Sequence, residues 1–396
     1  MKESEVIELA KKLGYAVEKV EAIVQEASHR QYFRITCPMP DKYKFRNGKA
    51  ESFIFCYMDS HLGNHDRLVE INKAFYKNPI MGSKSDSDFI GPYGGPFVPR
   101  ILSYDKELGV TVQEDVGDEN LYDLYDTDID LPRDASVLLG LSTALELLFS
   151  LYHAEIPNLK KLSEKNLIDQ MKTFVTVYLK NFLSISSSDI KAQNENIENL
   201  IDETMTNLNS QPWVNCHTDF EGRNIMIQEL LDYNGNICFD ESPCLIDYQD
   251  MCIGPAGIDL AGLLFDHYNF GTTEKSVVQS QIEELLAEKF DSSSFFERKA
   301  LNRSHVLTDT DPHLTNNKYG KELYEYARWG AIQRNMRILG TLSNLYLNDK
   351  KSFRLPDLKN ILFNLMEAIP NNHSELKLFI EKVVLPINDK KVKEII

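Results

Sequence analysis

The feature that most constrains this chain is a set of oxygen-bearing side chains divided between two segments. His217, Asp219 and Asn224 lie in one short stretch, and Asp247 comes later in the sequence. Between them, Asn234-Gly235 is a strong signal for a two-residue hairpin turn. A hairpin there would return the chain so that Asp247 faces the loop of Asp219 and Asn224. The fold must therefore bring a tight loop and the end of a strand together.

The order His-x-Asp-x-x-x-x-Asn followed by a later Asp is the layout of a phosphoryl-transfer site of the kinase type. Such a site places a base near the acceptor hydroxyl and holds magnesium against the phosphates. We predict that Asp219 is the general base and that Asn224 and Asp247 bind Mg²⁺, which prefers oxygen ligands. We expect His217 to brace the loop by hydrogen bonding and Asp259 to tie the next helix to it. The alternative, a polar loop with chance spacing, is disfavoured by the hairpin and by the apolar residues around Asp247.

The composition is that of an ordinary globular protein with room for two domains. The chain has 396 residues, 42% of them hydrophobic and 26% charged. A net charge of -17 disfavours a nucleic-acid-binding face. The charged N-terminus lacks the apolar core of a signal peptide, and we expect the apolar segment 135–152 to be a buried helix rather than a membrane span. The six cysteines form no Cys-x-x-Cys pair, so we predict reduced thiols and a cytoplasmic location. From the charge and the buried apolar segment, we predict neither a nucleic-acid nor a membrane partner.

Hydrophobic periodicity predicts an α+β chain with a β-rich first part and a mostly helical remainder. We place the boundary between a small N-terminal lobe, residues 1–117, and a larger helical C-terminal lobe, residues 118–396. A cleft between unequal lobes is a natural ligand site. The predicted strands lie at 19–37, 51–58, 101–104 and 110–114, and the predicted helices at 3–15, 66–76, 134–153, 163–183, 189–208, 273–290, 320–347 and 356–368.

Together, residues 217–224 and 247–261 resemble the aminoglycoside phosphotransferase and choline kinase superfamily, a branch of the protein-kinase-like fold. Other stretches resemble one group within it, the N-acetylmuramate/N-acetylglucosamine kinases. Residues 27–34 are similar to its Ala-Ser-x-Arg-x-Tyr-Phe-Arg segment, 114–117 to its hinge, and 331–340 to its Gln-Arg helix. The likeness extends from about residue 20 to 370.

The resemblance implies a bilobal protein-kinase-like fold and an ATP- and Mg²⁺-dependent phosphotransferase that acts on an amino-sugar hydroxyl in cell-wall sugar salvage. The N-terminal lobe would bind the nucleotide. The residues expected to bind it are Ser28, Arg30, Arg34, Glu114 and Val116. Apart from the resemblance, the residues themselves suggest candidates for binding the acceptor: Asp250, Arg223, Gln333, Arg334 and Arg337. For Asp250, capping of a turn is the alternative.

The strand that begins at Phe53 lacks the Lys that protein kinases use to pair with phosphates. A guanidinium binds phosphate oxygens bidentately, so Arg30, Arg34 or Arg223 could replace it. For Arg30 and Arg34, a surface ion pair is an equal alternative. Gln333 and Arg337 share a helix face and could line the acceptor pocket or be solvated.

Two other functions stay open. The acceptor could be choline, ethanolamine or an aminoglycoside, because these are cations and the chain is acidic. A kinase-like module that binds nucleotide without catalysis is disfavoured, since Asp219, Asn224 and Asp247 are all present. The sequence does not decide between sugars, between ATP and GTP, or between oligomeric states, nor does it assign roles to the loops at 38–50 and 82–96.

Overall fold

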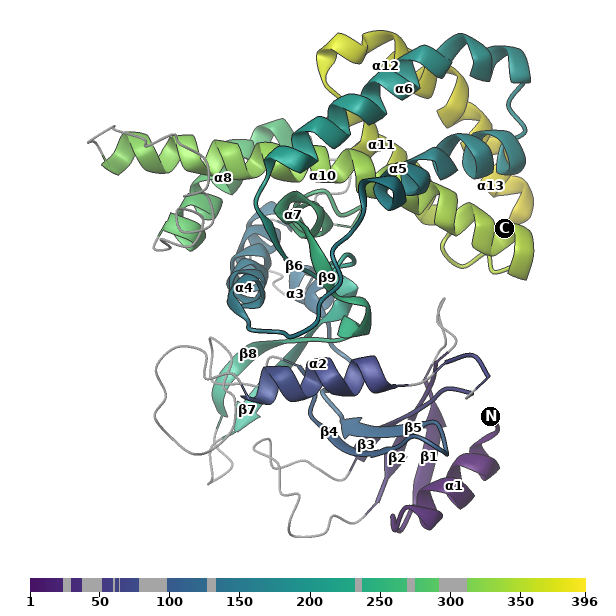
Figure 1. Cartoon of the computed structure of the whole chain (residues 1–396), viewed down its shortest axis with the longest axis vertical. Coiled ribbons are helices and arrows are strands. Elements are labelled where there is room, and N and C mark those ends of the chain that lie inside the picture. The colour runs from purple at the N-terminus through teal and green to yellow at the C-terminus, as the bar shows by residue number, and fades with distance from the viewer. Residues whose placement is uncertain are drawn as a thin grey trace. The chain divides into compact units, whose positions relative to one another are not determined.

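The computed structural model describes residues 1–23, 30–37, 52–59, 61–63, 65–77, 98–126, 133–231, 237–268, 275–291 and 312–396 (Figure 1). The predicted loops at 38–50 and 82–96 lie outside these residues, as do Ser28 and Asn234-Gly235. The chain forms two compact units. The first comprises Met1–Leu124, Ala154–Asn158 and Arg223–Asp250, and the second Tyr125–His153, Leu159–Gly222 and Met251–Ile396. The predicted division after residue 117 stays a prediction, and the structure adds that residues 223–250 pack with the first unit.

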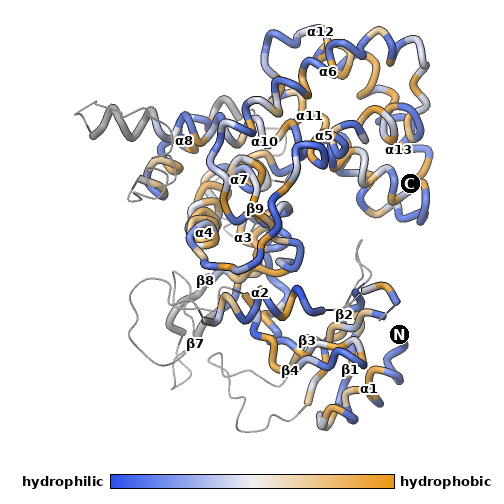
Figure 2. Tube along the Cα trace, in the orientation of Figure 1, coloured by the Kyte–Doolittle hydropathy of each residue, from blue (hydrophilic) through white to orange (hydrophobic). Residues whose placement is uncertain are grey.

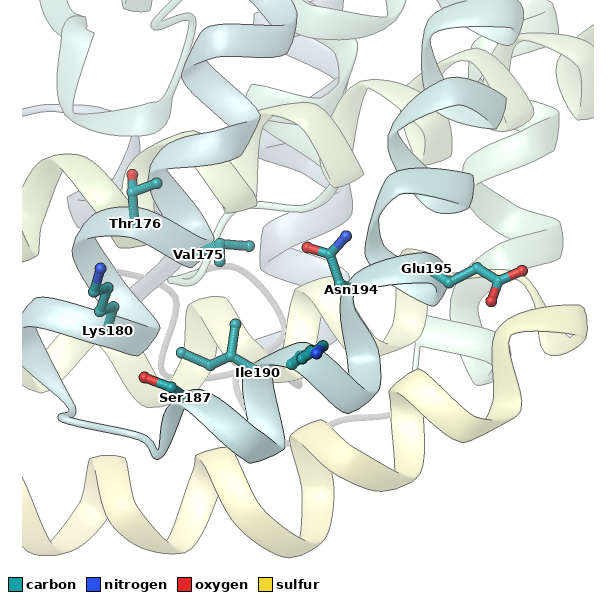
Figure 3. Close-up of a pocket in the computed structure, with 8 residues that line it drawn as sticks. Val175, Thr176, Lys180, Ser187, Ile190, Asn194 and Glu195 are labelled. Carbon is teal, nitrogen blue, oxygen red and sulfur yellow. The ribbon is translucent and has the colours of Figure 1, made fainter.

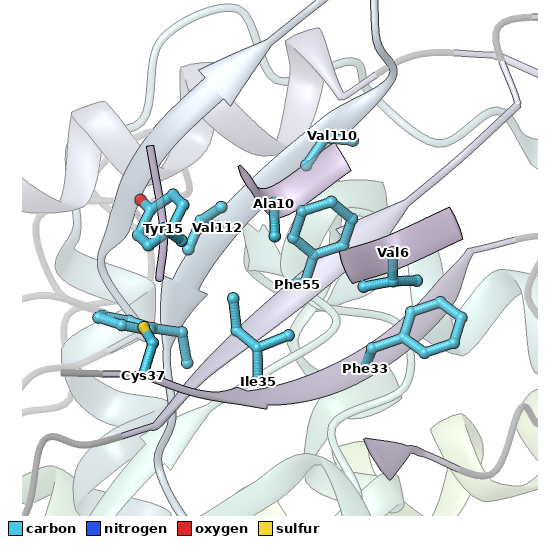
Figure 4. Packing of buried hydrophobic residues seen from close by; sticks show 10 residues of the cluster. Val6, Ala10, Tyr15, Phe33, Ile35, Cys37, Phe55, Val110 and Val112 are labelled. Carbon is cyan, nitrogen blue, oxygen red and sulfur yellow. The ribbon is translucent and has the colours of Figure 1, made fainter. Parts of the chain in front are cut away.

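The first unit contains a five-stranded antiparallel sheet with strand order β1-β2-β3-β5-β4. Alternation along β2 and β3 places Phe33, Ile35, Phe53 and Phe55 on one face, where all four are buried. Helix α1 covers this face with Val6 and Ala10, as Figure 4 shows. The elements are α1 (Glu3–Lys12), β1 (Lys19–Ala22), β2 (Gln31–Thr36), β3 (Ser52–Tyr57), β4 (Ile101–Asp105) and β5 (Val110–Glu114).

The rest of the first unit joins a helix to a hairpin far along the chain. Strands β7 (Ile225–Leu231) and β8 (Ile237–Leu245) pair antiparallel, and the short helix η4 (Tyr248–Asp250) follows them. Helix α2 (Asp66–Lys77) meets η4 through Asn72, whose amide donates to the Tyr248 hydroxyl at 2.7 Å and to the Pro99 carbonyl at 2.8 Å. These buried bonds tie the segment after the hairpin to the sheet-bearing part of the unit.

The second unit is helical, and α10 (Pro312–Asp349) packs against α5, α6, α7, α8, α11 and η2. A two-stranded sheet of β6 (Trp213–Cys216) and β9 (Cys252–Pro255) accompanies the helices. The remaining elements are α3 (Leu121–Asp126), which spans the change of unit, α4 (Arg133–His153), α5 (Glu164–Thr173), η2 (Phe174–Phe182), α6 (Ser187–Ser210), η3 (Gly222–Asn224), α7 (Ala256–Leu264), α8 (Lys275–Asp291), η5 (Leu355–Asp357), α11 (Leu358–Ala368), η6 (Asn371–His373), α12 (Ser374–Phe379), η7 (Ile380–Val384) and α13 (Leu385–Ile395).

Helices α7 and α10 approach so closely that side chains are excluded between them. A Cβ added at Gly330 would collide with the backbone of Gly257, and one added at Gly257 would collide with the Tyr326 carbonyl. A Cβ at Gly262, further along α7, would collide with the Phe220 carbonyl. The three glycines therefore set how closely α7 approaches both α10 and the loop that contains Phe220.

Helix α4 is the one described helix that is long and apolar enough to cross a membrane by length and composition. Figure 2 shows its hydrophobic residues, and 61% of an 18-residue apolar window within Asp134–His153 is buried. Because α4 packs against α7, α8 and β6, the interior of the second unit accounts for this apolar character.

Several helical regions differ from the predictions, among them α3, which no predicted helix covers. The single helix expected at 163–183 is α5 followed by a π-helix, η2, whose wider turns stack the rings of Phe174, Tyr178 and Phe182 at centroid distances of 5.8 and 6.1 Å. The helices α12 and α13 at the C-terminus were not predicted. Their apolar residues are few and spaced unevenly, so periodicity gave a weak signal.

Candidate active site

In the second unit, Asp219 lies on a loop that follows β6 and is held by α10. One guanidinium nitrogen of Arg337, Nη2, donates to Asp219 Oδ1 at 2.7 Å and to the Thr218 carbonyl at 3.1 Å. The two residues are 118 positions apart in the sequence. The carboxylate of the candidate base therefore has a fixed cationic partner.

The same loop is held from its other side by α7. The Asp259 carboxylate accepts hydrogen bonds from the backbone N–H groups of His217 at 2.7 Å and Thr218 at 2.8 Å. Asp259 is completely buried. Burial raises the pKa of its carboxyl group, while His217 and these two bonds act in the opposite direction. The carboxylate thus joins the first turn of α7 to the loop.

Thr218 adopts a backbone conformation that β-branched residues rarely use, with φ of 74°. The strain persists because both sides of the residue are bonded: its N–H donates to Asp259 and its carbonyl accepts from Arg337. Strained backbone of this kind clusters at functional sites, where the surrounding structure over-determines it. The geometry directs attention to the next residue, Asp219.

The Asp219 side chain retains 43% of its exposure, so a reactant can reach its carboxylate. Burial alone would raise its pKa, but Arg337, with smaller contributions from Arg334 and His217, holds the pKa below the usual value. His217 itself is buried, and its ring lies edge-on to Phe220 with a centroid distance of 6.1 Å. Asp219 is therefore an accessible carboxylate that stays ionised at neutral pH.

The two other polar residues predicted on this part of α10 point into the protein. Arg334 is 1% exposed and forms an ion pair with buried Glu221. Gln333 is also 1% exposed and donates to Gln170 of α5 at 2.8 Å. Sequence reasoning missed Glu221 and Gln170, because nothing local marks them as partners of a helix more than a hundred residues away.

In the first unit, Asn224 and Asp247 flank the open end of the β7–β8 ladder. Ile225 pairs with Leu245, and one step further the Ile246 N–H donates to the Asn224 carbonyl at 2.9 Å. Asp247 is the next residue along the chain. The backbone ladder thus brings the two predicted metal ligands to the same end of the hairpin.

Asp247 leaves the strand in a left-handed conformation, with φ of 59°. Its side chain is exposed and accepts from Gln249 Nε2 at 2.7 Å. The same amide reaches Asp250 at 3.3 Å, and Asp250 is also exposed. Asp tolerates this backbone conformation better than most residues, so the turn can aim its carboxylate away from the ladder.

The sheet face opposite α1 carries the two arginines that were predicted to meet phosphate. Tyr32 and Arg34 alternate toward this face along β2, and Arg30, one residue before the strand, is in phase with them. Burial raises the pKa of Tyr32 well above its usual value; Asp247 adds to this shift and Arg30 opposes it. The pKa of Cys56, opposite Tyr32 in the sheet, responds to the same two charges. Arg30 and Asp247 therefore both lie within electrostatic range of the half-buried Tyr32 phenol.

Arg34 instead pairs with carboxylates near the end of β5. Its Nε donates to Asp115 Oδ2 at 2.6 Å and its Nη2 to Oδ1 of the same residue at 3.0 Å. A further bond from Nη1 reaches Asp118 at 2.9 Å, and these carboxylates raise the pKa of Arg34. A bidentate pair of this kind is strong and specific, so the ion-pair alternative describes Arg34.

The predicted hinge contains one polar and one apolar residue. Glu114 accepts from the Arg100 N–H at 2.8 Å through its side chain, and its own N–H donates to the Arg100 carbonyl at 2.9 Å. Val116 packs with Met226 and Cys244 in a small apolar cluster.

The residues at the hairpin end fit a hard cation that keeps other ligands. Within the described ranges, no group of three or more His, Cys, Asp or Glu side chains could hold a metal ion. Asn224 and Asp247 supply one amide and one carboxylate side chain, and Mg²⁺ commonly uses one or two such groups together with water and phosphate oxygens. Arg223, half-buried in η3, adds positive charge beside Asn224 in the sequence.

A separate surface hollow of about 540 Å³ lies between η2 and α6. Figure 3 shows Val175, Thr176, Lys180, Ser187 and Ile190 along it. None of the candidate catalytic or metal-binding residues lines this hollow, and most of its lining residues are exposed. We therefore do not assign the chemistry to it.

Comparison with known proteins finds relatives of this chain. The model of the phosphotransferase enzyme family matches residues 91–290, about half of the chain. An N-acetylmuramate/N-acetylglucosamine kinase of Neisseria meningitidis serogroup B is 23% identical over 300 residues, covering 75% of this chain and 77% of that protein.

Two solved structures show the same protein-kinase-like fold. Aminoglycoside phosphotransferase APH(2'')-Ib bound to ADP has a TM-score of 0.51 at 12% identity, covering 93% of this chain and all of that one. An ethanolamine kinase of Plasmodium vivax has a TM-score of 0.50 at 11% identity, covering 90% and 84%. The predicted fold class, with a small sheet-rich N-terminal part and a larger helical C-terminal part, is confirmed.

Proposed function

Because the chain belongs to the phosphotransferase enzyme family, and is a small-molecule kinase that uses ATP, we propose that its acceptor is an amino sugar of the N-acetylmuramate or N-acetylglucosamine type. The proposal places the protein in salvage of cell-wall sugars in the cytoplasm. Buried thiols suit a reducing compartment, and the five cysteines whose side chains the structure describes are buried and unpaired.

The observation that carries the catalytic part of the proposal, transfer to a hydroxyl group, is the state of Asp219. Its carboxylate is accessible, is ionised at neutral pH, and is fixed by Arg337 on a strained loop. A general base needs all three properties, since it must meet the acceptor hydroxyl in a set geometry and be able to take its proton. We assign Asp219 the task of orienting that hydroxyl toward the γ-phosphate.

Asn224 and Asp247 would hold magnesium at the open end of the β7–β8 hairpin. A bound Mg²⁺ neutralises charge on the phosphate oxygens. The left-handed backbone at Asp247 directs its carboxylate, and Gln249 steadies it through a bond of 2.7 Å. These residues act on the nucleotide rather than on the acceptor.

Arg30 is our candidate for the cation that replaces the missing strand Lys. It shares the electrostatic surroundings of Tyr32 and Cys56 with Asp247, whereas Arg34 is bonded to Asp115 and Asp118. A guanidinium close to a metal-binding carboxylate is well placed to pair with phosphate oxygens. We propose Glu114 and Val116 as the backbone and apolar surface that receive the adenine.

The acceptor class rests on the sequence relative. Arg334 is held by Glu221 and Gln333 by Gln170, so we do not assign either to the acceptor. Asp250 and Arg223 stay candidates for acceptor contact. The 23% identity to a named amino-sugar kinase is what favours a sugar over a cationic alcohol.

Parallel incubation of the purified protein with ATP, Mg²⁺ and N-acetylmuramate, N-acetylglucosamine, choline or kanamycin tests this proposal. Mass spectrometry should detect a gain of one phosphate on one of the two sugars, with matching ADP release. Phosphorylated choline or kanamycin would overturn the amino-sugar assignment and keep the kinase. ADP binding without any phosphorylated acceptor from the panel would count against the proposed substrate class as a whole.

A further inference from the structure

Two arginines, three positions apart on α10, reach two carboxylates of the same short loop. Arg334 pairs with Glu221, and Arg337 bonds both Asp219 and the Thr218 carbonyl. The loop also makes a tight turn of its own, in which the Glu221 N–H donates to the Asp219 carbonyl at 3.0 Å. Three bonds therefore join residues 218–221 to α10, and a fourth closes the turn within the loop.

We propose that Arg337 is a positioning residue that fixes the Asp219 carboxylate and the Thr218 peptide in one geometry, and that it does not bind the acceptor. The inference rests on the proposed function, because it concerns the residue assigned there as the base. It also revises the expectation that Arg337 lines the acceptor pocket.

The geometry separates these two roles. The Arg337 side chain is 18% exposed, less than half the exposure of Asp219, and Nη2 already serves two acceptors in the loop. An arginine that received an anionic acceptor would present its guanidinium edge to solvent. Here that edge is turned toward a strained peptide, where loss of either bond would let Thr218 relax.

The charges around Asp219 come from three directions. Arg337 and Arg334 approach from α10, His217 belongs to the loop, and the buried carboxylate of Asp259 lies behind the loop on α7. Arg334 is already paired with Glu221. Arg337 is consequently the charge whose removal should change the ionisation of Asp219 most.

Arg337→Gln and Arg337→Lys distinguish positioning from acceptor binding, with Arg328→Gln as the matched control. Gln can still donate to the Thr218 carbonyl but carries no charge, and Lys keeps the charge without the planar fork. Arg328 lies on the same helix, and its ion-pair partner is Glu325 of that helix rather than a residue of the loop. Each variant is assayed with the acceptor that the wild type phosphorylates.

We expect Arg337→Gln to lower kcat by about 10²-fold, the cost of slight misplacement of a reacting group, with KM for the acceptor nearly unchanged. The acid limb of its kcat profile should move to higher pH by about 1 to 3 units, because loss of a nearby cation raises a carboxyl pKa. Arg337→Lys should restore the acid limb and part of kcat, while Arg328→Gln should match the wild type. A rise in KM with kcat and the acid limb unchanged would overturn the proposal in favour of acceptor binding.

A double-mutant cycle measures the contact without any acceptor. Thermal unfolding of the wild type, Arg337→Gln, Asp219→Asn and the double variant should show non-additive changes in melting temperature at pH 7. The folded-state pKa of Asp219 is depressed, so the coupling should be present above the usual Asp pKa and should disappear as pH falls through the lower folded value. Additive effects at pH 7 would refute the contact. Coupling in a protein that phosphorylates none of the sugars would instead refute the proposed function alone.

Discussion

The loop that carries Asp219 and the turn that carries Asp247 are both built on left-handed backbone, but they are held by different means. Thr218, with φ of 74°, is fixed by Asp259 of α7 and Arg337 of α10. Asp247, with φ of 59°, is fixed by the β7–β8 ladder and by Gln249 two residues away. The candidate base thus depends on long-range contacts, and the candidate metal ligand depends on local ones. Substitutions distant in sequence from the Asp219 loop should therefore reduce general-base catalysis more than metal binding.

The largest effect on turnover should come from Asp219→Asn, which keeps the size of the side chain and removes the base. We expect kcat to fall by about 10³-fold, within the range for general-base catalysis. The dissociation constant for ATP, measured by titration calorimetry, should change little because the metal ligands are intact. Turnover equal to the wild type would remove Asp219 from the role of base.

Asp247→Asn should produce the next largest effect and should act on the metal. Asn tolerates the left-handed conformation as well as Asp does, so the turn should survive while one negative charge is lost. The Mg²⁺ concentration for half-maximal turnover should rise at least about tenfold, since even indirect partners of a metal are worth that much. Unfolding temperature should stay close to the wild type, and an unchanged Mg²⁺ requirement would contradict the assignment.

Asp259→Asn should weaken the loop that carries Asp219 without affecting Asn224 and Asp247, the candidate metal ligands. One amide atom can still accept from His217 or Thr218, but the amide nitrogen would face the other N–H. The free energy of unfolding should fall by about 2 kcal/mol, the cost of an unsatisfied buried donor, and kcat should fall with it. Chemical denaturation measures the loss of stability. A Mg²⁺ titration of the same sample should show that the Mg²⁺ concentration for half-maximal turnover is unchanged.

Gly262→Ala should disturb the same loop through packing alone. The new methyl group would collide with the Phe220 carbonyl, at a cost of about 1 to 3 kcal/mol for overpacking. The matched control is Gly320→Ala, which collides with the Glu283 backbone on α8 instead. Both variants should melt earlier, but only Gly262→Ala should lower kcat of the folded fraction at a permissive temperature. Equal kcat in the two would show that the loop does not depend on α7.

The smallest effect on turnover should follow loss of the ion pairs of His267, which lies just beyond the C-terminal end of α7. Its Nδ1 lies 3.0 Å from Asp266 Oδ1, and its Nε2 lies 3.3 Å from Asp357 Oδ2. Burial lowers its pKa, but the two carboxylates outweigh burial and raise the pKa to about 9. The stabilisation should therefore be complete below the usual His pKa and should be lost as pH rises through about 9. His267→Gln should remove that pH dependence from the melting temperature while leaving kcat at pH 7 nearly unchanged.

Much of the fold was predictable because its signals are local. The strand predicted at 51–58 contains β3, and the helix predicted at 134–153 agrees with α4 to one residue. The single strand predicted at 19–37 is instead two strands, β1 and β2, which pair antiparallel. The predicted helix at 320–347 lies inside the longer α10, since polar residues before it conceal its start. The π-helical continuation of α5 has the same apolar spacing as an α-helix, so periodicity could not separate them.

The candidate site was predictable in its residues and not in its contacts. Motif spacing singled out Asp219, Asn224, Asp247 and Asp259. The partner of Asp219, Arg337, lies 118 residues further on, and nothing in its own neighbourhood shows that it faces a carboxylate. The ion pair of Arg34 with Asp115 crosses the sheet in the same way. Long-range pairs depend on the packed structure, which local patterns do not encode.

The glycine contacts of α7 have a consequence for redesign. Because Gly257, Gly262 and Gly330 have no side chains, α7 contacts α10 and the loop that contains Phe220 directly through backbone atoms. These contacts fix the position of residue 219. Efforts to give the protein a different acceptor should leave these three positions untouched and vary exposed residues such as Asp250. A library that randomised the helix crossing would recover mostly proteins whose proton acceptor is misplaced, whatever sugar their pockets admit.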